Sequence, residues 1–187
     1  MIVRHCLLFA VLVMSSYTDL AHGKIYNWCT LPAIALGLTL NGVLGGVWEG
    51  GWLGANLGSS ALALLIVAVL FAWPYMKGGI AAGDVKLMVA VASIGGLHNM
   101  FIAYALFYCA LIGALMAVLV FIWRGQLAEG LKGAVRFTFS TQRLGETGEA
   151  AAGTKPPASR ITVPYGLAIA IGSVVAWYKV ELIAMTH

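Results

Sequence analysis

Two aspartates are the side chains best placed to do chemistry in this chain. Asp19 and Asp84 are the only aspartates among its 187 residues, and each stands where a very hydrophobic stretch meets a polar turn. An ionisable side chain beside a membrane segment is costly to keep, so it is a candidate functional residue by default. Two neighbouring carboxyl groups share a proton, because both cannot easily ionise together. Such a pair can hydrolyse a peptide bond: one group takes a proton from water while the other protonates the peptide group.

The residue patterns of other catalytic classes are missing from the sequence. It contains no Gly-x-Ser-x-Gly, no HExxH and no P-loop. The four histidines are dispersed without metal-ligand spacing: His5, His22, His98 and His187. The three cysteines form no CxxC pair, and we expect them to be small buried side chains: Cys6, Cys29 and Cys109. We therefore expect neither a metal ion nor another cofactor.

The composition is that of an integral membrane protein. Hydrophobic residues make up 61% and charged residues 10%, against about 25% charged residues in soluble domains. The mean hydropathy is +0.91. The apolar runs are continuous rather than alternating, so we predict an all-α, polytopic membrane protein with one domain over residues 1–187. The net charge of +4 is explained by basic loops of a membrane protein, and nucleic acid is not an expected partner.

About six membrane-spanning helices are predicted to position the aspartates. The apolar segments cover residues 2–18, 28–47, 61–73 (ending before Pro74), 85–94, 101–123 and 161–180. The first could be mistaken for a cleaved secretory signal, but no clear small-x-small cleavage site follows its core. Residues 124–160 form the only long polar stretch. In this loop we expect a short amphipathic helix at 126–139 on the membrane surface, followed by a flexible linker.

Basic residues predict the orientation in the membrane. The turns after the first, third and fifth segments hold nine of the eleven: Lys24, Lys77, Lys86, Arg124, Lys132, Arg136, Arg143, Lys155 and Arg160. Only Arg4 and Lys179 fall on the other side. The positive-inside rule therefore predicts that these turns are cytoplasmic and that both termini are external. Asp19 and Asp84 then belong to the same membrane face, as a catalytic pair requires.

The neighbours of each aspartate differ. Gly83 precedes Asp84 and could permit a backbone shape or a close approach that a side chain would block. Asp84 should lie at or near a helix N-cap, where the helix dipole favours its charged form, whereas Asp19 should lie at the end of a helix, where the dipole disfavours charge. On this basis alone, Asp84 would be the base and Asp19 the acid that holds the proton.

Three motifs resemble those of the type IV prepilin peptidases. Residues 19–27 (DLAHGKIYN), followed by Thr30-Leu31-Pro32, resemble the first-aspartate motif, and residues 78–88 (GGIAAGDVKLM) resemble the GxGD motif. Residues 163–166 (VPYG) with Ala168 and Gly172 resemble the last helix of the family. The order of the motifs is that of the family. The short, single-domain enzymes associated with tight-adherence (Flp) pili are the most similar members.

The resemblance implies a function. These enzymes are multi-pass aspartic endopeptidases of the bacterial inner membrane that cut the basic leader from a prepilin at the cytoplasmic side, after a glycine. It implies that Asp19 and Asp84 are catalytic and that Gly83, Lys86 and Asn27 shape the site. Two positions depart from the family: Ala81 replaces the first glycine of GxGD, and Tyr26 stands where proline is common. The chain also lacks the cysteine-paired insertion of larger members that N-methylate the pilin, which leaves methyltransferase activity open.

Other interpretations remain at this point. Asn27 could simply cap a turn, Lys86 could mark orientation, and Pro164 and Gly166 could bend or pack a membrane helix. A small proton-coupled transporter would use the two aspartates as relay groups. A non-catalytic subunit of a secretion machine would tolerate the loss of either carboxyl group.

Overall fold

The computed structural model describes residues 2–47, 51, 54–78, 80–123 and 165–186. These residues form six α-helices and one 3-10 turn, with no strand among them. The helices are α1 (Ile2–His22), α2 (Asn27–Gly45), α3 (Leu57–Met76), α4 (Ala82–Gly95), α5 (Phe101–Trp123) and α7 (Tyr165–Thr186), and the turn η2 is His98–Met100. The predicted amphipathic helix, linker and start of the sixth segment lie outside the described residues.

The six predicted apolar segments correspond to these six helices. Five of the helices are long and apolar enough to cross a membrane. The exception is α4, whose 14 residues span about 21 Å at 1.5 Å per residue, against a hydrocarbon core of about 30 Å. The chain is thus an all-α, multi-pass membrane protein.

Two of the predicted helix ends were wrong. The first helix continues to His22, so Asp19 lies within its last turn rather than in the turn after it. The third helix continues through Pro74 to Met76. Proline removes one backbone donor, but the last turn is closed regardless, because the Lys77 N–H donates to the Trp73 carbonyl at 3.2 Å. Pro74 is therefore accommodated near the helix end.

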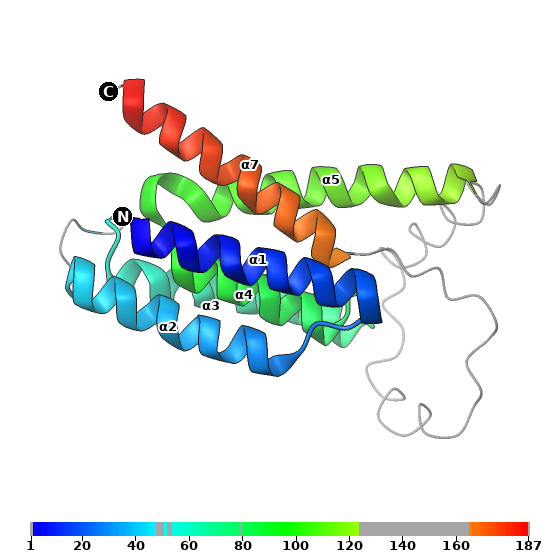
Figure 1. The fold of residues 1–187 in the computed structure, drawn as a ribbon, viewed down its shortest axis with the longest axis horizontal. Coiled ribbons are helices and arrows are strands. Elements are labelled where there is room, and N and C mark those ends of the chain that lie inside the picture. The colour runs from blue at the N-terminus through cyan, green and yellow to red at the C-terminus, as the bar shows by residue number, and fades with distance from the viewer. Residues whose placement is uncertain (1, 48–50, 52–53, 79, 124–164, 187) are drawn as a thin grey trace.

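The short helix α4 lies at the centre of the bundle (Figure 1). It packs against each of α1, α2, α3, α5 and α7. Seven of its residues are buried: Leu87, Met88, Ala90, Val91, Ala92, Ser93 and Ile94. Because the surrounding helices cover α4, it does not have to match the thickness of the bilayer. The first turn of α4, which carries Asp84, is thus fixed inside the protein.

Helices α5 and α7 pack closely where a glycine faces a backbone. A Cβ atom at Gly172 would lie 2.6 Å from the backbone nitrogen of Cys109 on α5. Small residues allow such close approach between membrane helices. This contact sets the position of α7, whose first residues reach the candidate site.

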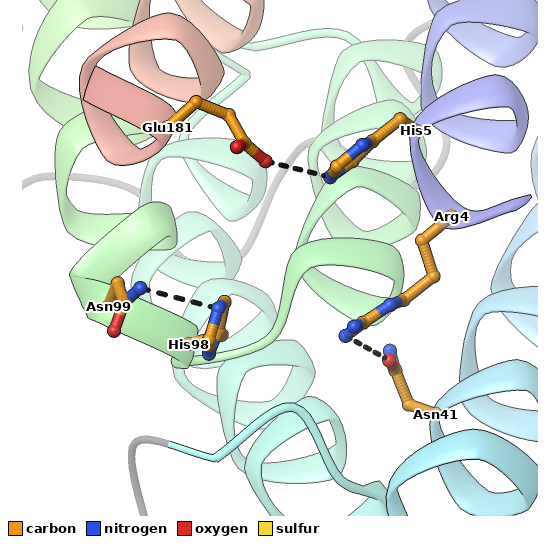
Figure 2. A network of polar contacts seen from close by, with 6 residues as sticks. All are labelled: Arg4, His5, Asn41, His98, Asn99 and Glu181. Atoms are coloured by element: carbon orange, nitrogen blue, oxygen red, sulfur yellow. Dashed lines mark hydrogen bonds and ion pairs between the residues drawn. The ribbon is translucent and has the colours of Figure 1, made fainter. Parts of the chain in front are cut away.

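A polar network joins the helices at the end of the bundle where α1 begins and α7 ends (Figure 2). Arg4 Nη1 donates to Asn41 Oδ1 at 3.1 Å. The Asn41 amide donates in turn to the carbonyls of Ser93 and Ile94, at 3.1 and 2.9 Å. These carbonyls belong to the last turn of α4, which has no intrahelical donors for them. Asn41 thus holds the end of α4 that is remote from Asp84.

A second contact in the network ties α1 to α7. His5 Nε2 lies 3.2 Å from Glu181 Oε1, and Figure 2 shows the two side chains pointing toward each other from their helices. The same two helices meet again at their opposite ends, where Asp19 contacts the start of α7. The pair α1 and α7 is therefore joined by a polar contact at each end.

Candidate active site

The Asp19 side chain is held by the start of another helix. The Gly166 N–H donates to Asp19 Oδ2 at 3.0 Å, and the Leu167 N–H also bonds to this carboxyl group. Both N–H groups belong to the first turn of α7, where backbone donors are free and the helix dipole favours an anion. A Cβ atom at position 166 would lie 2.7 Å from Asp19 Oδ2, so glycine gives the carboxylate room to reach this helix end.

Asp84 lies in the first turn of α4, two residues after the helix begins. The pKa of Asp84 is raised to about 6, mainly by burial and in addition by the negative charge of Asp19. The two aspartates also line the same pocket, and like charges raise the pKa of a carboxyl group at short range. The fold thus brings together two side chains that are far apart in the sequence.

One pocket contains both carboxyl groups. It has a volume of about 340 Å³ and is lined by Asp19, Asp84, Gly83, Asn27 and Tyr165, together with residues of the turn between α1 and α2. The pocket lies where α1 ends and α4 begins, at the opposite end of α1 from the polar network of Figure 2. Of the site residues predicted from the sequence, four line the pocket: Asp19, Asp84, Gly83 and Asn27.

The fifth predicted residue, Lys86, contributes indirectly. Its Nζ donates to Asn27 Oδ1 at 2.9 Å. This bond connects α4 to the first residue of α2, and so holds the turn between α1 and α2 against the start of α4. The pair therefore fixes one wall of the pocket.

Gly83 lies close to Ile25, in the turn between α1 and α2. A Cβ atom there would lie 3.0 Å from the Ile25 Cβ, tighter than an ordinary contact. Its φ is not positive, so the backbone conformation does not call for glycine. The close approach to Ile25 is the reason that applies. Ala81, which replaces the first glycine of the GxGD pattern, has φ −74° and ψ 146°. Any residue adopts this extended conformation, so alanine is compatible with the local backbone.

Two residues of the site were missed as candidates from the sequence. Tyr165 lines the pocket, and Gly166 binds Asp19 through its N–H. Both belong to the VPYG motif, which was the available signal, but neither the motif nor the alternative role of Gly166 in bending or packing predicted a contact with Asp19. Val163 and Pro164 of the motif lie outside the described residues.

The helix-dipole argument for acid and base is incomplete. It took account only of the helix that carries each aspartate. Asp19 does lie at the end of its own helix, but its carboxylate receives N–H groups from the start of α7. Asp84 is the residue whose pKa is raised to about 6, so it keeps a proton more readily than an ordinary aspartate.

A comparison with protein-family models gives a match that includes both aspartates. The model of the type IV leader peptidase family matches residues 6–122. The chain belongs to this family. No curated protein and no solved structure gives a significant match. Family membership indicates a peptidase and gives no support to the interpretation as a proton-coupled transporter.

Proposed function

We propose that this leader peptidase is an aspartic endopeptidase of the bacterial inner membrane that removes the leader of Flp-type prepilins at the cytoplasmic face. Asp19 and Asp84 are its catalytic pair, and Gly83, Lys86 and Asn27 shape the site. The observation that carries the proposal is the position of both carboxyl groups in one pocket, inside a chain of the leader peptidase family. No metal or cofactor takes part in this chemistry.

The surroundings of the two carboxyl groups support a division of roles between them. Asp19, which accepts N–H groups at the start of α7, is the ionised base. It removes a proton from water, whose oxygen attacks the carbonyl carbon of the scissile peptide. Asp84, whose pKa is raised to about 6, holds the proton and gives it to the carbonyl oxygen. The C–N bond then breaks as Asp19 returns its proton to the leaving nitrogen, and Asp84 regains a proton from the hydroxyl group of the intermediate.

The test is cleavage of a co-expressed prepilin by single and double variants. Asp19→Asn and Asp84→Asn should each abolish leader cleavage while the protein still inserts and accumulates in the membrane. The two groups act as one unit, so the double variant should lose no more activity than either single variant. Cleavage near the wild-type rate by either single variant would exclude the pair.

The same experiment separates the proposal from a non-catalytic role in pilus assembly. A structural subunit would support assembly without either carboxyl group. Prepilin that stays uncut in cells with Asp84→Asn, although the variant protein is as abundant as wild type, would show that the carboxyl group acts in the cleavage itself.

A further inference from the structure

A second cavity lies at the end of the bundle where α1 begins and α7 ends, and we call it the terminal cavity. It has a volume of about 150 Å³ and is lined by charged and polar side chains of three elements: Arg4 and His5 of α1, His98 and Asn99 of η2, and Glu181 of α7. Figure 2 shows these side chains. None of them lines the pocket of the catalytic pair. The terminal cavity is therefore a separate candidate binding site.

The terminal cavity lies at the level of the membrane surface. Arg4 and His5 belong to the first turn of α1, which has 21 residues. A helix of this length spans about 31 Å, close to the thickness of the hydrocarbon core of about 30 Å. Its first turn is therefore among the lipid headgroups. Leu8 and Phe101 line the cavity beside the polar groups, so its wall is part polar and part apolar, as the interface of a bilayer is.

The terminal cavity carries one fixed charge of each sign. The Arg4 guanidinium uses one N–H donor for Asn41, and the Glu181 carboxylate uses one oxygen for His5. Both groups have further hydrogen-bonding capacity beyond these contacts. A simple anion would be attracted by Arg4 and repelled by Glu181, and a simple cation would meet the reverse. A ligand that carries both charges is complementary to both side chains.

Two further features of the wall point to a bound ligand. Trp177 lines the terminal cavity, and its indole N–H is buried without a hydrogen-bond acceptor in the described part of the chain. A buried donor without an acceptor is costly and calls for an explanation. The backbone at the cavity is also strained, because Asn99 and Met100 have φ values of 45° and 59°. Such strain is kept mostly at functional sites.

We propose that the terminal cavity binds the headgroup of a phospholipid that carries a primary ammonium group, as phosphatidylethanolamine does. The phosphate oxygens accept from the Arg4 guanidinium and supply an acceptor for the Trp177 N–H, and the ammonium group donates to Glu181. Phosphatidylglycerol has no cation for Glu181, and the trimethylated nitrogen of phosphatidylcholine has no N–H to donate. The proposal is independent of the peptidase mechanism, since no residue of the catalytic pair takes part.

The first test is thermal unfolding of the purified full-length protein in detergent with one added phospholipid at a time. A ligand that binds only the folded protein stabilises it, so saturating phosphatidylethanolamine should raise the Tm by about 3 °C or more. Phosphatidylglycerol and phosphatidylcholine with the same acyl chains should raise it clearly less. Soluble phosphoethanolamine and inorganic phosphate distinguish the lipid from a free phosphate compound. An equal rise with either of them, or with all three lipids, would overturn the proposal.

Charge variants test the assigned contacts. Glu181→Gln keeps the shape of the side chain, and the variant should lose the preference for phosphatidylethanolamine over phosphatidylglycerol. A purely structural role of Glu181 would lower the Tm and leave that preference unchanged. Arg4→Gln should weaken the effect of all three lipids, because the phosphate is common to them. Lys179→Gln, at an exposed position of α7 outside the cavity, is the matched control and should behave as wild type.

A second measurement does not depend on stability. Native mass spectrometry of the wild-type protein, from detergent with an equal mixture of the three lipids, should show bound phosphatidylethanolamine in preference to the other two. Glu181→Gln should retain the three lipids equally or none of them, and Lys179→Gln should keep the preference. Retention of the three lipids in equal amounts by the wild-type protein would indicate unspecific lipid contact only and would overturn the proposal.

Discussion

The two carboxyl groups of the site lie in different electrostatic surroundings. Asp19 accepts backbone N–H groups at a helix start, which stabilise a negative charge. Asp84 is half-buried beside that charge, and its pKa is raised to about 6. Pairs of carboxyl groups whose surroundings differ in this way can divide the roles of base and acid between them. The division has two consequences that can be measured separately, one in activity and one in stability.

The first consequence is a loss of activity at high pH. The mechanism needs Asp84 in its protonated form, and the protonated fraction falls as the pH rises through its pKa of about 6. We expect kcat/KM for leader cleavage to fall about tenfold per pH unit well above that value. The measurement is the cleavage rate of the purified enzyme in detergent between pH 5 and 8.5, at limiting and at saturating substrate concentrations. A flat profile from pH 6 to 8 would contradict the proton-donor role of Asp84.

The second consequence concerns stability. A folded-state pKa above the ordinary 3.8 means that the folded protein binds the proton more tightly than the unfolded chain, so stability falls as the pH rises from about 4 through 6. Asp84→Asn removes this penalty. At pH 7.5 the variant should be more stable than wild type by on the order of 1 kcal/mol, after allowance for solvent in the pocket.

Thermal unfolding in detergent at pH 4.5 and 7.5 checks this expectation. The advantage of Asp84→Asn should be larger at the higher pH. Thr39→Val, which changes an exposed hydroxyl that bonds only within α2 in the described contacts, is the control, and its stability relative to wild type should be the same at both pH values. An Asp84→Asn protein less stable than wild type at pH 7.5 would show that the carboxylate has favourable contacts that outweigh its burial.

Two glycines at the site have little room for a side chain, which leads to a third prediction. Gly166→Ala places a Cβ atom 2.7 Å from Asp19 Oδ2, so the carboxylate must turn away from the start of α7. Gly83→Leu places a larger side chain against Ile25 and fills the pocket. Both variants should lose most cleavage activity at near-normal abundance, measured as cleavage rate per amount of membrane protein. Gly23→Ala is not a suitable control because its φ is +61°; Ala81→Gly, with an extended backbone, should stay active.

At the scale of the elements, α4 is held at both of its ends. Asp84 and the Lys86–Asn27 bond belong to its beginning, and the Asn41 amide binds the carbonyls at its end. The polar network thus contributes to the site without touching it, because it fixes the helix that carries Asp84. The sequence gives little sign of this, since Asn41 is a single polar residue near the end of an apolar segment.

Removal of this polar contact should destabilise the bundle. Asn41→Leu leaves two buried carbonyls without their donor and Arg4 without its acceptor, and we expect a loss of about 2–4 kcal/mol. Thermal unfolding in detergent measures the effect. Thr39→Val on the same helix is the control, because the Thr39 hydroxyl is exposed and bonds only within α2 in the described contacts. Equal stability of the two variants would mean that solvent or lipid replaces the Asn41 contacts.

At the scale of the whole molecule, the sequence predicted the fold class and the proximity of the two aspartates better than the contacts between helices. Continuous apolar runs fixed the all-α membrane architecture, and α5 has the predicted bounds of 101–123. The motif around each aspartate led to the residues that share a pocket. The contact between Asp19 and the start of α7 could not be read from local patterns, because it depends on how two distant helices pack. For the same reason, the groove between α3, α5 and α7 could not be predicted from the sequence.

The orientation of the molecule in the membrane is the last prediction. Both termini lie at one end of the bundle, and the pocket of the catalytic pair lies at the other (Figure 1). The nine-to-two distribution of basic residues predicts that the pocket end is cytoplasmic and that the termini are external. Reporter fusions near Gly145 should therefore give a cytoplasmic signal, and fusions near Gly50 or at His187 an external one. A cytoplasmic signal at His187 would mean that the chain crosses the membrane an even number of times, rather than once, between Gly145 and His187. It would also place the pocket on the external side, where an uncut leader is not available.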